Sequence, residues 1–269
     1  DLVIGAYFLS LPIEKLIYNH FINQARYKIL DNHFLNVVGI TGSYGKTSTK
    51  NIIKDILKTE YNVCMTPHSY NTPMGITTTV NNYLKKIDEY LICEMGAKKL
   101  GEIKELCDIV YPKMGIITSI GPHHLDTFGN IKNIINTKFE LIESLPTDGL
   151  AILNYDNNYI LNYKIKNNVR VVSFGVDNDK VDYYALNIHY GPNGSTFEVR
   201  YPNEERFLFK TKLLGKHNIY NILAGVALAD YLNININKVI NVVSQLEPVS
   251  HRLEIINFPN YTIIDDSFN

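Results

Sequence analysis

The chain has 269 residues, of which 45% are hydrophobic and 20% are charged, and its formal net charge at pH 7 is −1. These values are typical of a globular protein with one large or two ordinary domains, and the near-zero charge argues against binding to nucleic acid or to an acidic membrane surface. Its three cysteines, Cys64, Cys93 and Cys107, are widely spaced and include no C-x-x-C pair. We therefore expect reduced core cysteines in a cytoplasmic protein, and neither a disulfide framework nor a zinc site.

The first 36 residues are predicted to form a helical segment. Residues 2–11 are apolar, but a bilayer requires about 20 such residues, so they form either a buried segment or the end of a longer membrane segment. Beyond Pro12 an amphipathic helix is predicted to about Ile29, and we expect it to pack on the rest of the chain. Its apolar residues are Ile13, Leu16, Ile17, Phe21 and Ala25. Since the chain starts at Asp1 and stops at Asn269 directly after an apolar run, we expect that both ends are cut.

The most informative stretch is an apolar run that leads through a glycine-punctuated turn into a helical pattern, at residues 37–57. In such a unit, backbone N–H groups and the helix N-terminus are arranged to bind a polyphosphate. Lys46 is then expected to reach the terminal phosphates, and the Thr47 hydroxyl to ligate Mg²⁺. The sequence therefore predicts a phosphate-binding loop.

The loop departs from the strict G-x-x-x-x-G-K-[ST] pattern. Ile40 occupies the position of the first glycine, and the loop instead has Gly42 three residues before Gly45. A glycine-rich turn without a ligand is the alternative, which the flanking strand and helix patterns disfavour.

Short apolar runs then alternate with segments of helical length. The predicted strands are 37–40, 63–65, 90–93, 115–118, 151–153 and 169–174, and the predicted helices are 47–58, 101–107 and 131–145. This alternation favours an α/β fold with a doubly wound, mostly parallel sheet. Ligands bind at the carboxyl ends of the strands in such sheets, so functional side chains are expected there.

The pattern changes after residue 183. Alternating apolar residues and turn sequences in 184–211 predict a small section of antiparallel strands, and helices are predicted at 217–231 and 235–245. Glu247 and Pro248 mark a boundary, with further strands predicted at 253–258 and 261–264. The expected organisation is therefore an N-terminal helical segment at 1–36, a central domain at 37–248 and the start of another domain at 249–269.

Several predicted strands are followed by polar residues. These are the loop 66–75, Glu94, the segment 118–126 with two adjacent histidines, and the pair Asn154 and Asp156; Lys138 lies within a predicted helix. Each has an ordinary structural explanation, such as a surface loop, a solvated carboxylate or lysine, or a structural histidine. A carboxylate at a strand end also suits Mg²⁺, which prefers oxygen ligands.

Eight motifs occur together in one order: T-G-S-Y-G-K-T-S-T at 41–49, E-M-G-A at 94–97, I-G-P-H-H-L-D-T-F-G at 120–129, T-K-F-E at 137–140, L-N-Y-D at 153–156, G-K-H-N-I-Y-N-I-L-A-G at 215–225, H-R-L-E at 251–254 and D-D-S-F-N at 265–269. From residue 37 to its end the chain resembles the Mur ligase superfamily, and within it the MurF type, which adds D-alanyl-D-alanine to a UDP-muramoyl tripeptide. The resemblance implies a central ATPase domain followed by the first strands of a truncated, Rossmann-like C-terminal domain.

The resemblance implies a set of ATP-binding residues. The loop residues Gly42, Ser43, Tyr44, Gly45, Lys46, Thr47 and Ser48 match those around the phosphates; Asn154 and Asp156 match a nucleotide-side motif, Asn218 and Asn221 match residues near the adenine, and Arg252 and Asp266 match contacts to the phosphates and ribose.

It also implies a catalytic centre with two Mg²⁺ ions. Thr47 matches a ligand of the first ion, Glu94 the acidic metal ligand and His124 a ligand of the second ion, while Lys138 matches a lysine that becomes carbamylated and then binds metal. With Lys46, these residues are the expected catalytic set. Asn71 and Thr72 lie where the family holds its nucleotide-sugar substrate, and His123 receives no role.

The implied activity is an ADP-forming amide ligase of cell-wall precursor synthesis that works through an acyl phosphate. The implied partners are a UDP-muramoyl peptide and D-alanyl-D-alanine, the protein is expected to be a monomer, and no nucleic acid is expected. Only 36 residues precede the phosphate loop region, so either a UDP-binding domain is cut away or the protein has a different, membrane-proximal N-terminus.

Other functions remain open at this point. Within the superfamily the alternatives are another muramyl amino-acid ligase, a pseudomurein peptide ligase or a folylpolyglutamate synthase. Outside it, a P-loop NTPase switch would leave His124 and Lys138 without a role. A fragment that binds ATP weakly without turnover is a further alternative.

Overall fold

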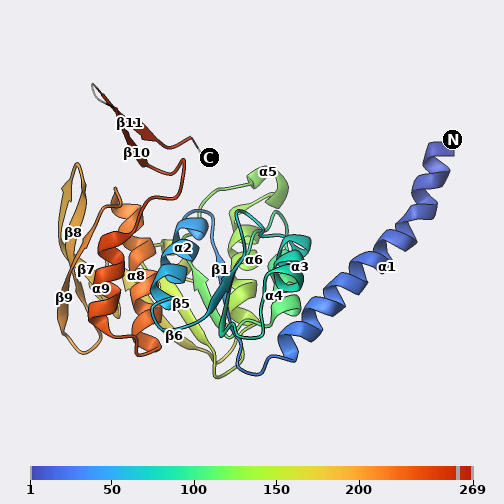
Figure 1. Cartoon of the computed structure of the whole chain (residues 1–269), viewed down its shortest axis with the longest axis horizontal. Coiled ribbons are helices and arrows are strands. Elements are labelled where there is room, and N and C mark those ends of the chain that lie inside the picture. Colours follow the sequence, from blue (N-terminus) through green and yellow to red (C-terminus); the bar gives the residue numbers. More distant parts are fainter. Residues whose placement is uncertain (1, 259–260, 268–269) are drawn as a thin grey trace.

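The computed structural model describes residues 2–258 and 261–267, and its centre is a twisted sheet covered by helices on both faces (Figure 1). Within these residues nine strands form the main sheet, in the order β2-β3-β1-β4-β5-β6-β7-β8-β9. The strands are β1 (Asn36–Thr41), β2 (Val63–Met65), β3 (Tyr90–Glu94), β4 (Met114–Ile117), β5 (Leu150–Asn154), β6 (Arg170–Gly175), β7 (Tyr183–Gly191), β8 (Gly194–Arg200) and β9 (Arg206–Thr211). All neighbours from β2 to β7 are parallel, which confirms the predicted α/β fold.

The order of the strands reverses at β1, which lies between β3 and β4. The register pairs Ile40 with Glu94 and Thr41 with Ile117, so the chain leaves all three strands at the same edge of the sheet. A crevice at this point is the usual place for a ligand in an open α/β sheet. The loop after β1 therefore lies where the topology favours binding.

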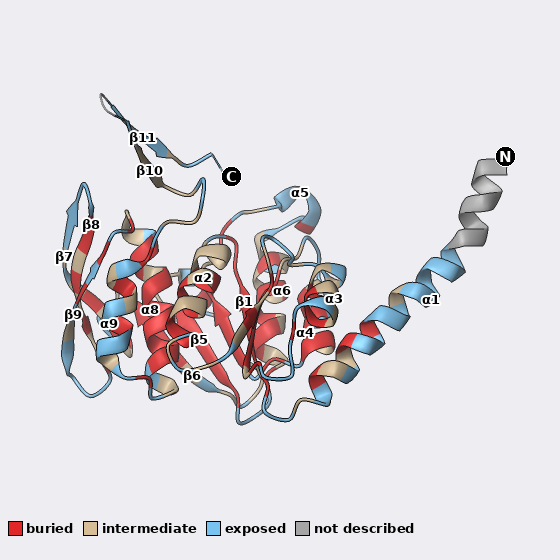
Figure 2. Ribbon diagram, in the orientation of Figure 1, coloured by how far each residue is buried: buried red, intermediate tan, exposed pale blue. Residues whose placement is uncertain are grey.

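Two hydrophobic clusters fill the spaces between the sheet and its helices. The helices are α2 (Lys46–Leu57), α3 (Pro73–Asn82), α4 (Glu102–Val110), α5 (Leu125–Phe128), α6 (Ile131–Glu143), α7 (Asn158–Leu161), α8 (Lys216–Tyr231) and α9 (Ile236–Gln245). Residues of α2, α8 and α9 belong to one cluster, and residues of α3, α4 and α6 to the other. Figure 2 shows the central parallel strands and the inner faces of the helices that cover them as buried.

The predicted antiparallel section continues the main sheet. Strand β7 is parallel to β6, and β8 and β9 follow it as antiparallel neighbours. Phe197 and Phe209 stack on the side covered by α8 and α9, with ring centroids 5.8 Å apart. This section therefore shares its core with the phosphate-loop helix α2.

Helix α1 (Leu2–Leu30) differs from the prediction in the face that it buries. Ile13, Leu16, Ile17 and Phe21 are exposed, and the buried residues are Ile22, Ala25 and Ile29. The physical reason is that only the second half of the helix packs on α3 and α4, while the first half extends away from the body (Figure 1). A search of the described part of the chain finds no helix long and apolar enough to cross a membrane.

Outside the main sheet, one further element differs from the prediction and one pair of predicted strands is confirmed. Helix α3 begins inside the predicted loop 66–75, where Thr72 caps it by accepting a hydrogen bond from the Gly75 N–H and Pro73 takes the first turn. Thr-Pro is a helix-start signal that the prediction did not use. Beyond the predicted boundary at residue 248, β10 (Glu254–Asn257) and β11 (Thr262–Asp265) form a separate antiparallel pair. The last two residues of the D-D-S-F-N motif lie outside the described residues.

Candidate active site

The loop between β1 and α2 requires glycine at two positions because neighbouring atoms approach its backbone. A Cβ on Gly42 would lie 2.1 Å from Thr118 Oγ1, and a Cβ on Gly45 would lie 2.7 Å from Asn221 Oδ1. Gly45 also has a φ of 82°, which a residue with a side chain rarely adopts. The loop therefore needs its glycines at 42 and 45, whichever residue stands at 40.

Hydrogen bonds to the segment after β4 fix this loop. The Ser43 N–H donates to the Ser119 carbonyl (2.7 Å), and the buried Ser43 hydroxyl accepts from the Gly121 N–H (3.0 Å). The Thr118 hydroxyl donates to the Tyr44 carbonyl (2.5 Å). The Ser43 side chain thus holds the loop against the rest of the protein, whereas Tyr44 is 56% exposed.

The carboxylate of Glu94, at the end of β3, is contacted by three side chains, two from α2 and one from the loop before α3. Thr47 Oγ1 donates to Oε2 (2.9 Å), and Asn71 Nδ2 donates to Oε1 (3.1 Å). Lys50 Nζ, which the sequence analysis did not identify, lies 3.1 Å from Oε2. The structure thus brings together three predicted residues, Thr47, Asn71 and Glu94, and adds a buried lysine to them.

Two predicted lysines flank the same region, and burial lowers the pKa of each. Lys46, at the start of α2, donates to the Gly42 carbonyl (2.9 Å), and burial lowers its pKa. Lys138 on α6 is only 4% exposed; burial and, after it, the charge of Lys46 lower its pKa to about 7. A lysine with this pKa is a nucleophilic neutral amine in a large fraction of molecules at pH 7.

Of the two adjacent histidines, His123 is half-buried and His124 is exposed. His124 has a φ of 56° and caps the short helix α5, and its ring centroid lies 3.8 Å from that of His123. The pKa of His123 is lowered by burial and then by the charges of His124 and Lys46. Both rings line the cavities described next.

Two cavities meet at the phosphate loop. The larger has a volume of about 570 Å³, and its lining includes the predicted residues Tyr44, Gly45, Thr47, Ser48, Glu94, Asn154, Asn218, Asn221, Arg252 and Asp266. The smaller, of about 360 Å³, is lined by Gly42, Thr72 and Lys138 together with Glu102 and Glu105. Ser43, Lys46, Asn71, His123 and His124 line both.

Asparagines on α8 form a hydrogen-bonded row along the larger cavity. Asn221 Nδ2 donates to Asn218 Oδ1 (3.2 Å), and the Thr49 hydroxyl donates to Asn221 Oδ1 (3.0 Å). His217, which the sequence analysis did not identify, lines the cavity beside them, and burial lowers its pKa. The row joins α8 to α2 and presents amide groups next to the phosphate loop.

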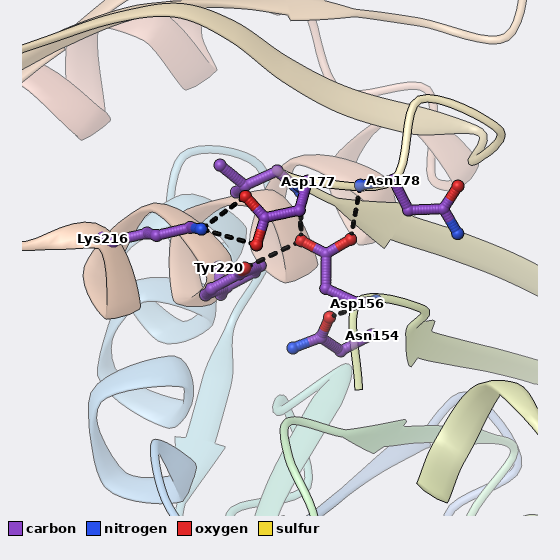
Figure 3. A network of polar contacts seen from close by, with 7 residues as sticks. Asn154, Asp156, Asp177, Asn178, Lys216 and Tyr220 are labelled. Carbon is purple, nitrogen blue, oxygen red and sulfur yellow. Dashed lines mark hydrogen bonds and ion pairs between the residues drawn. The ribbon is translucent and has the colours of Figure 1, made fainter. Parts of the chain in front are cut away.

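Asp156 is placed differently from the other predicted residues. Its carboxylate accepts backbone N–H groups of Val176 (2.7 Å), Asp177 (2.7 Å) and Asn178 (2.8 Å), and also the Tyr220 hydroxyl (2.8 Å) (Figure 3). It lines neither cavity, whereas Tyr220 and Asn154 line the larger one. Asp156 therefore fixes the loop at residues 176–178 and the Tyr220 ring, which forms part of the wall of the larger cavity. Lys216 completes this network by contacting both oxygens of Asp177 (2.5 and 2.6 Å).

The segment before β10 reaches the loop from the far side of the larger cavity. Arg252 Nη2 lies 3.4 Å from Thr47 Oγ1, and the Asp266 carboxylate accepts the Leu253 N–H (3.3 Å). Two residues predicted from the most distant motifs thus lie beside the phosphate loop.

The donor groups at the junction fit a divalent cation. Thr47 offers a hydroxyl and Glu94 a carboxylate within hydrogen-bond distance of each other, and Mg²⁺ prefers such oxygen donors. His124 lines the same cavity. The Lys138 amine would have to be converted to an anion before it could contribute.

Comparison with known proteins agrees with this geometry. Residues 40–229 match the family model of the Mur ligase middle domain. The UDP-N-acetylmuramoyl-tripeptide–D-alanyl-D-alanine ligase of Buchnera aphidicola is 34% identical over 244 residues, which are 90% of this chain and 52% of that protein.

Solved structures of MurF share the fold. MurF from Acinetobacter baumannii superposes with a TM-score of 0.86 at 27% identity, over 94% of this chain and 55% of that one. MurF from Thermotoga maritima, solved in complex with ADP, gives 0.81 at 26% identity, over 94% and 57%. The chain thus spans about half the length of the relatives it matches.

Proposed function

This chain belongs to the Mur ligase family, and from that premise we propose that it is the ATP-binding part of a ligase that adds D-alanyl-D-alanine to a UDP-muramoyl tripeptide. The observation that carries the proposal is the junction of the two cavities at Lys46, with Glu94 in the wall of the larger cavity and Lys138 in the wall of the smaller. One cavity suits a nucleotide and the other the substrate that it activates. The names of the relatives support the choice of substrates.

The reaction begins when an oxygen of the tripeptide carboxylate attacks the γ-phosphorus of ATP, which forms an acyl phosphate and releases ADP. The amine of D-alanyl-D-alanine then attacks the acyl carbon and loses a proton, and phosphate leaves with the former carboxylate oxygen. The first step brings two anions together, so it needs positive charge at one point. Lys46 and the N-terminus of α2 supply it.

Thr47, Glu94 and His124, with a carbamylated Lys138, would hold two Mg²⁺ ions. When bound, the ions neutralise phosphate charge and polarise the reacting oxygens. The depressed pKa of Lys138 supports its modification, because a neutral amine can attack CO₂ and yield an anionic carbamate.

The nucleotide is proposed to lie along α8, with its adenine near Asn218 and Asn221. Asn154 lines this side of the cavity, while Asp156 acts indirectly by holding the Tyr220 ring. Arg252 and Asp266 approach from the other side, toward the phosphates and the ribose. In the smaller cavity, Asn71 and Thr72 are proposed to contact the nucleotide-sugar substrate.

We further propose a division into an N-terminal segment (1–36), the central ATPase domain (37–248) and the first strands of the C-terminal ligase domain (249–269). Movement of the last part would carry Arg252 toward the phosphates and exclude water that hydrolyses acyl phosphates. We propose a monomeric protein that works in the cytoplasm, in keeping with its three free cysteines.

The test is phosphate release by the full-length protein with ATP, UDP-muramoyl tripeptide and D-alanyl-D-alanine, each omitted in turn. We expect release only when all three are present. Release with ATP alone would contradict the proposal and favour an NTPase. A protein that binds ATP but releases no phosphate with this set would contradict the choice of substrates.

A further inference from the structure

We infer that Lys50 is a positioning residue whose charge neutralises Glu94 and keeps divalent-cation binding weak until the phosphates of a nucleotide add negative charge. The inference rests on the proposed function, because it takes Glu94 as a metal ligand. It concerns a residue that none of the sequence motifs assigns to the site.

Lys50 is buried in the site and paired with Glu94. Its side chain is 1% exposed, and that of Glu94 is 2% exposed, with 3.1 Å between Nζ and Oε2. Lys50 follows Lys46 by one helical turn on α2, so both ammonium groups face the phosphate-loop end of the sheet. A buried ion pair of this kind has no solvent to replace either partner.

The hydrogen bonds of Glu94 show how a cation would meet this pair. Its Oε2 is engaged by both Lys50 and Thr47, and its Oε1 by Asn71. A carboxylate oxygen offers two lone pairs, so Oε2 has both of its lone pairs engaged. A cation must therefore use the remaining lone pair of Oε1 or replace one of the donors at Oε2.

The surrounding charge also opposes a cation in the absence of nucleotide. Lys50 offsets the single charge of Glu94, and Lys46 and Arg252 line the same cavity. Glu94 is the only carboxylate that contacts Lys50 among the ion pairs of the described residues. Charges separated by a few ångströms in a partly buried site interact strongly. The phosphates of a bound nucleotide would reverse this balance.

A second contact explains why a lysine would be needed here and not an apolar residue. Lys50 Nζ also donates to the His68 carbonyl (2.5 Å), and His68 has a φ of 43°, an unfavourable conformation for its side chain. The same loop carries Asn71, which donates to Glu94. Lys50 thus holds the carboxylate and the loop that contacts it in one arrangement.

The experiment measures binding of Mn²⁺, by the loss of the electron paramagnetic resonance signal of the free ion, to the full-length protein without nucleotide at pH 8. The variant is Lys50→Gln, which removes the charge and keeps an amide donor for the His68 carbonyl. We expect nucleotide-free Mn²⁺ binding to tighten by about tenfold, or about 1.4 kcal/mol. Binding that is unchanged or weaker in the folded variant would overturn the inference.

Lys54→Gln is the matched control. It removes the same charge from the next turn of α2, where Lys54 pairs with the partly exposed Asp55 (2.7 Å). We expect less than a twofold change in Mn²⁺ binding. An equal gain in both variants would overturn the inference, because it would reflect the general charge of the helix.

The wild-type protein gives an independent result if Lys50→Gln does not fold. With ADP present, and after correction for Mn²⁺ bound by ADP in solution, Mn²⁺ must bind at least about tenfold more tightly than without it. Equal affinities would overturn the inference. Glu94→Gln tests separately whether Glu94 is a metal ligand, as the proposed function requires. If this variant binds Mn²⁺ with ADP as tightly as the wild type, the proposed metal site fails together with the inference about Lys50.

Discussion

The two cavities share the phosphate loop but are built from different chemistry. The larger is bordered on α8 by amides that bond to one another, Asn218 and Asn221, and by a tyrosine held by Asp156. The smaller contains Lys138, whose pKa burial lowers to about 7, together with the carboxylates of Glu102 and Glu105. Amides keep their donors and acceptors at every pH, whereas a buried lysine does not.

This contrast suggests that the α8 side of the larger cavity recognises a ligand, whereas the smaller cavity, like the Glu94 side of the larger one, takes part in the chemistry. Substitutions on the α8 side should then change nucleotide affinity, and substitutions in the smaller cavity should change turnover or its pH dependence. A substitution at the shared loop should affect both. The predictions below test this division, beginning with the largest expected effect.

Lys46→Ala removes the cation that lines both cavities. We expect turnover to fall by at least about 10²–10³-fold, because charge that develops on the transferred phosphoryl group loses its stabilisation. The measurement is kcat of the full-length ligase. Lys54→Ala, two turns further along the same helix and outside both cavities, should stay near the wild-type rate. A Lys46→Ala variant of similar rate would refute the site.

Lys138→Ala should be inactive, and a small carboxylate such as acetate should restore part of the activity. The reason is that the proposed carbamate is an anion that a diffusible carboxylate can replace. Lys132→Ala provides the control, since Lys132 lies exposed on the same helix. Full activity of Lys138→Ala without any addition would mean that the carbamate has no role.

The pH dependence of carbamate formation follows from the depressed pKa of Lys138. With a pKa of about 7, about half of the amines are neutral at pH 7, whereas an ordinary lysine with a pKa of about 10.4 is almost wholly charged. Because only the neutral amine reacts, the initial rate of ¹³CO₂ incorporation at fixed dissolved CO₂ should rise through pH 7 and level off above about pH 8. Carbon-13 NMR measures it, with Lys138→Arg as the blank. Incorporation that begins only near pH 10 would contradict the lowered pKa of Lys138 and the burial that causes it.

Tyr220→Phe tests the larger cavity alone. It removes the hydroxyl that donates to Asp156, at a cost of about 1 kcal/mol. We expect KM for ATP to rise by at most about fivefold while kcat stays near wild type. Tyr159→Phe, at a partly exposed position outside both cavities, should change neither. A fall in kcat without a change in KM would break the proposed division.

Tyr18→Phe tests the wall of the smaller cavity. The Tyr18 hydroxyl on α1 donates to Glu105 (2.9 Å), and burial followed by this contact raises the pKa of Tyr18 to about 12. We expect a stability change within about 0.5 kcal/mol and no change in KM for ATP. Thermal unfolding and ATP kinetics measure both. A changed KM for ATP would show that the cavities are not independent.

Most of the fold followed from the sequence because its elements have strong local patterns. Strand 63–65 was predicted with the bounds that the structure shows, and the other strands of the parallel sheet differ from their predicted bounds by no more than a few residues. Of the five residues predicted to form the packed face of α1, only Ala25 is buried, because periodicity shows which residues are apolar but not which of them have a partner to cover them. Helix α3 was missed because the loop was interpreted by its polar residues.

The site was predictable where a motif carries the chemistry and not where tertiary packing does. The sequence places Lys46 and Thr47 on a glycine loop, and the structure brings Arg252 to the same loop from over 200 residues away. Lys50 resembled an ordinary helix lysine until its burial against Glu94 was visible. The role of Asp156 depends on backbone groups of residues 176–178, which no local pattern associates with it.

The most direct test of the account is whether the substrate carboxylate attacks ATP at the junction of the cavities. The measurement uses full-length protein, ATP, D-alanyl-D-alanine and a UDP-muramoyl tripeptide whose reacting carboxylate carries ¹⁸O, with mass analysis of the released phosphate. The account predicts that each phosphate formed in ligation carries one oxygen from the carboxylate. Phosphate whose new oxygen comes only from water would contradict it.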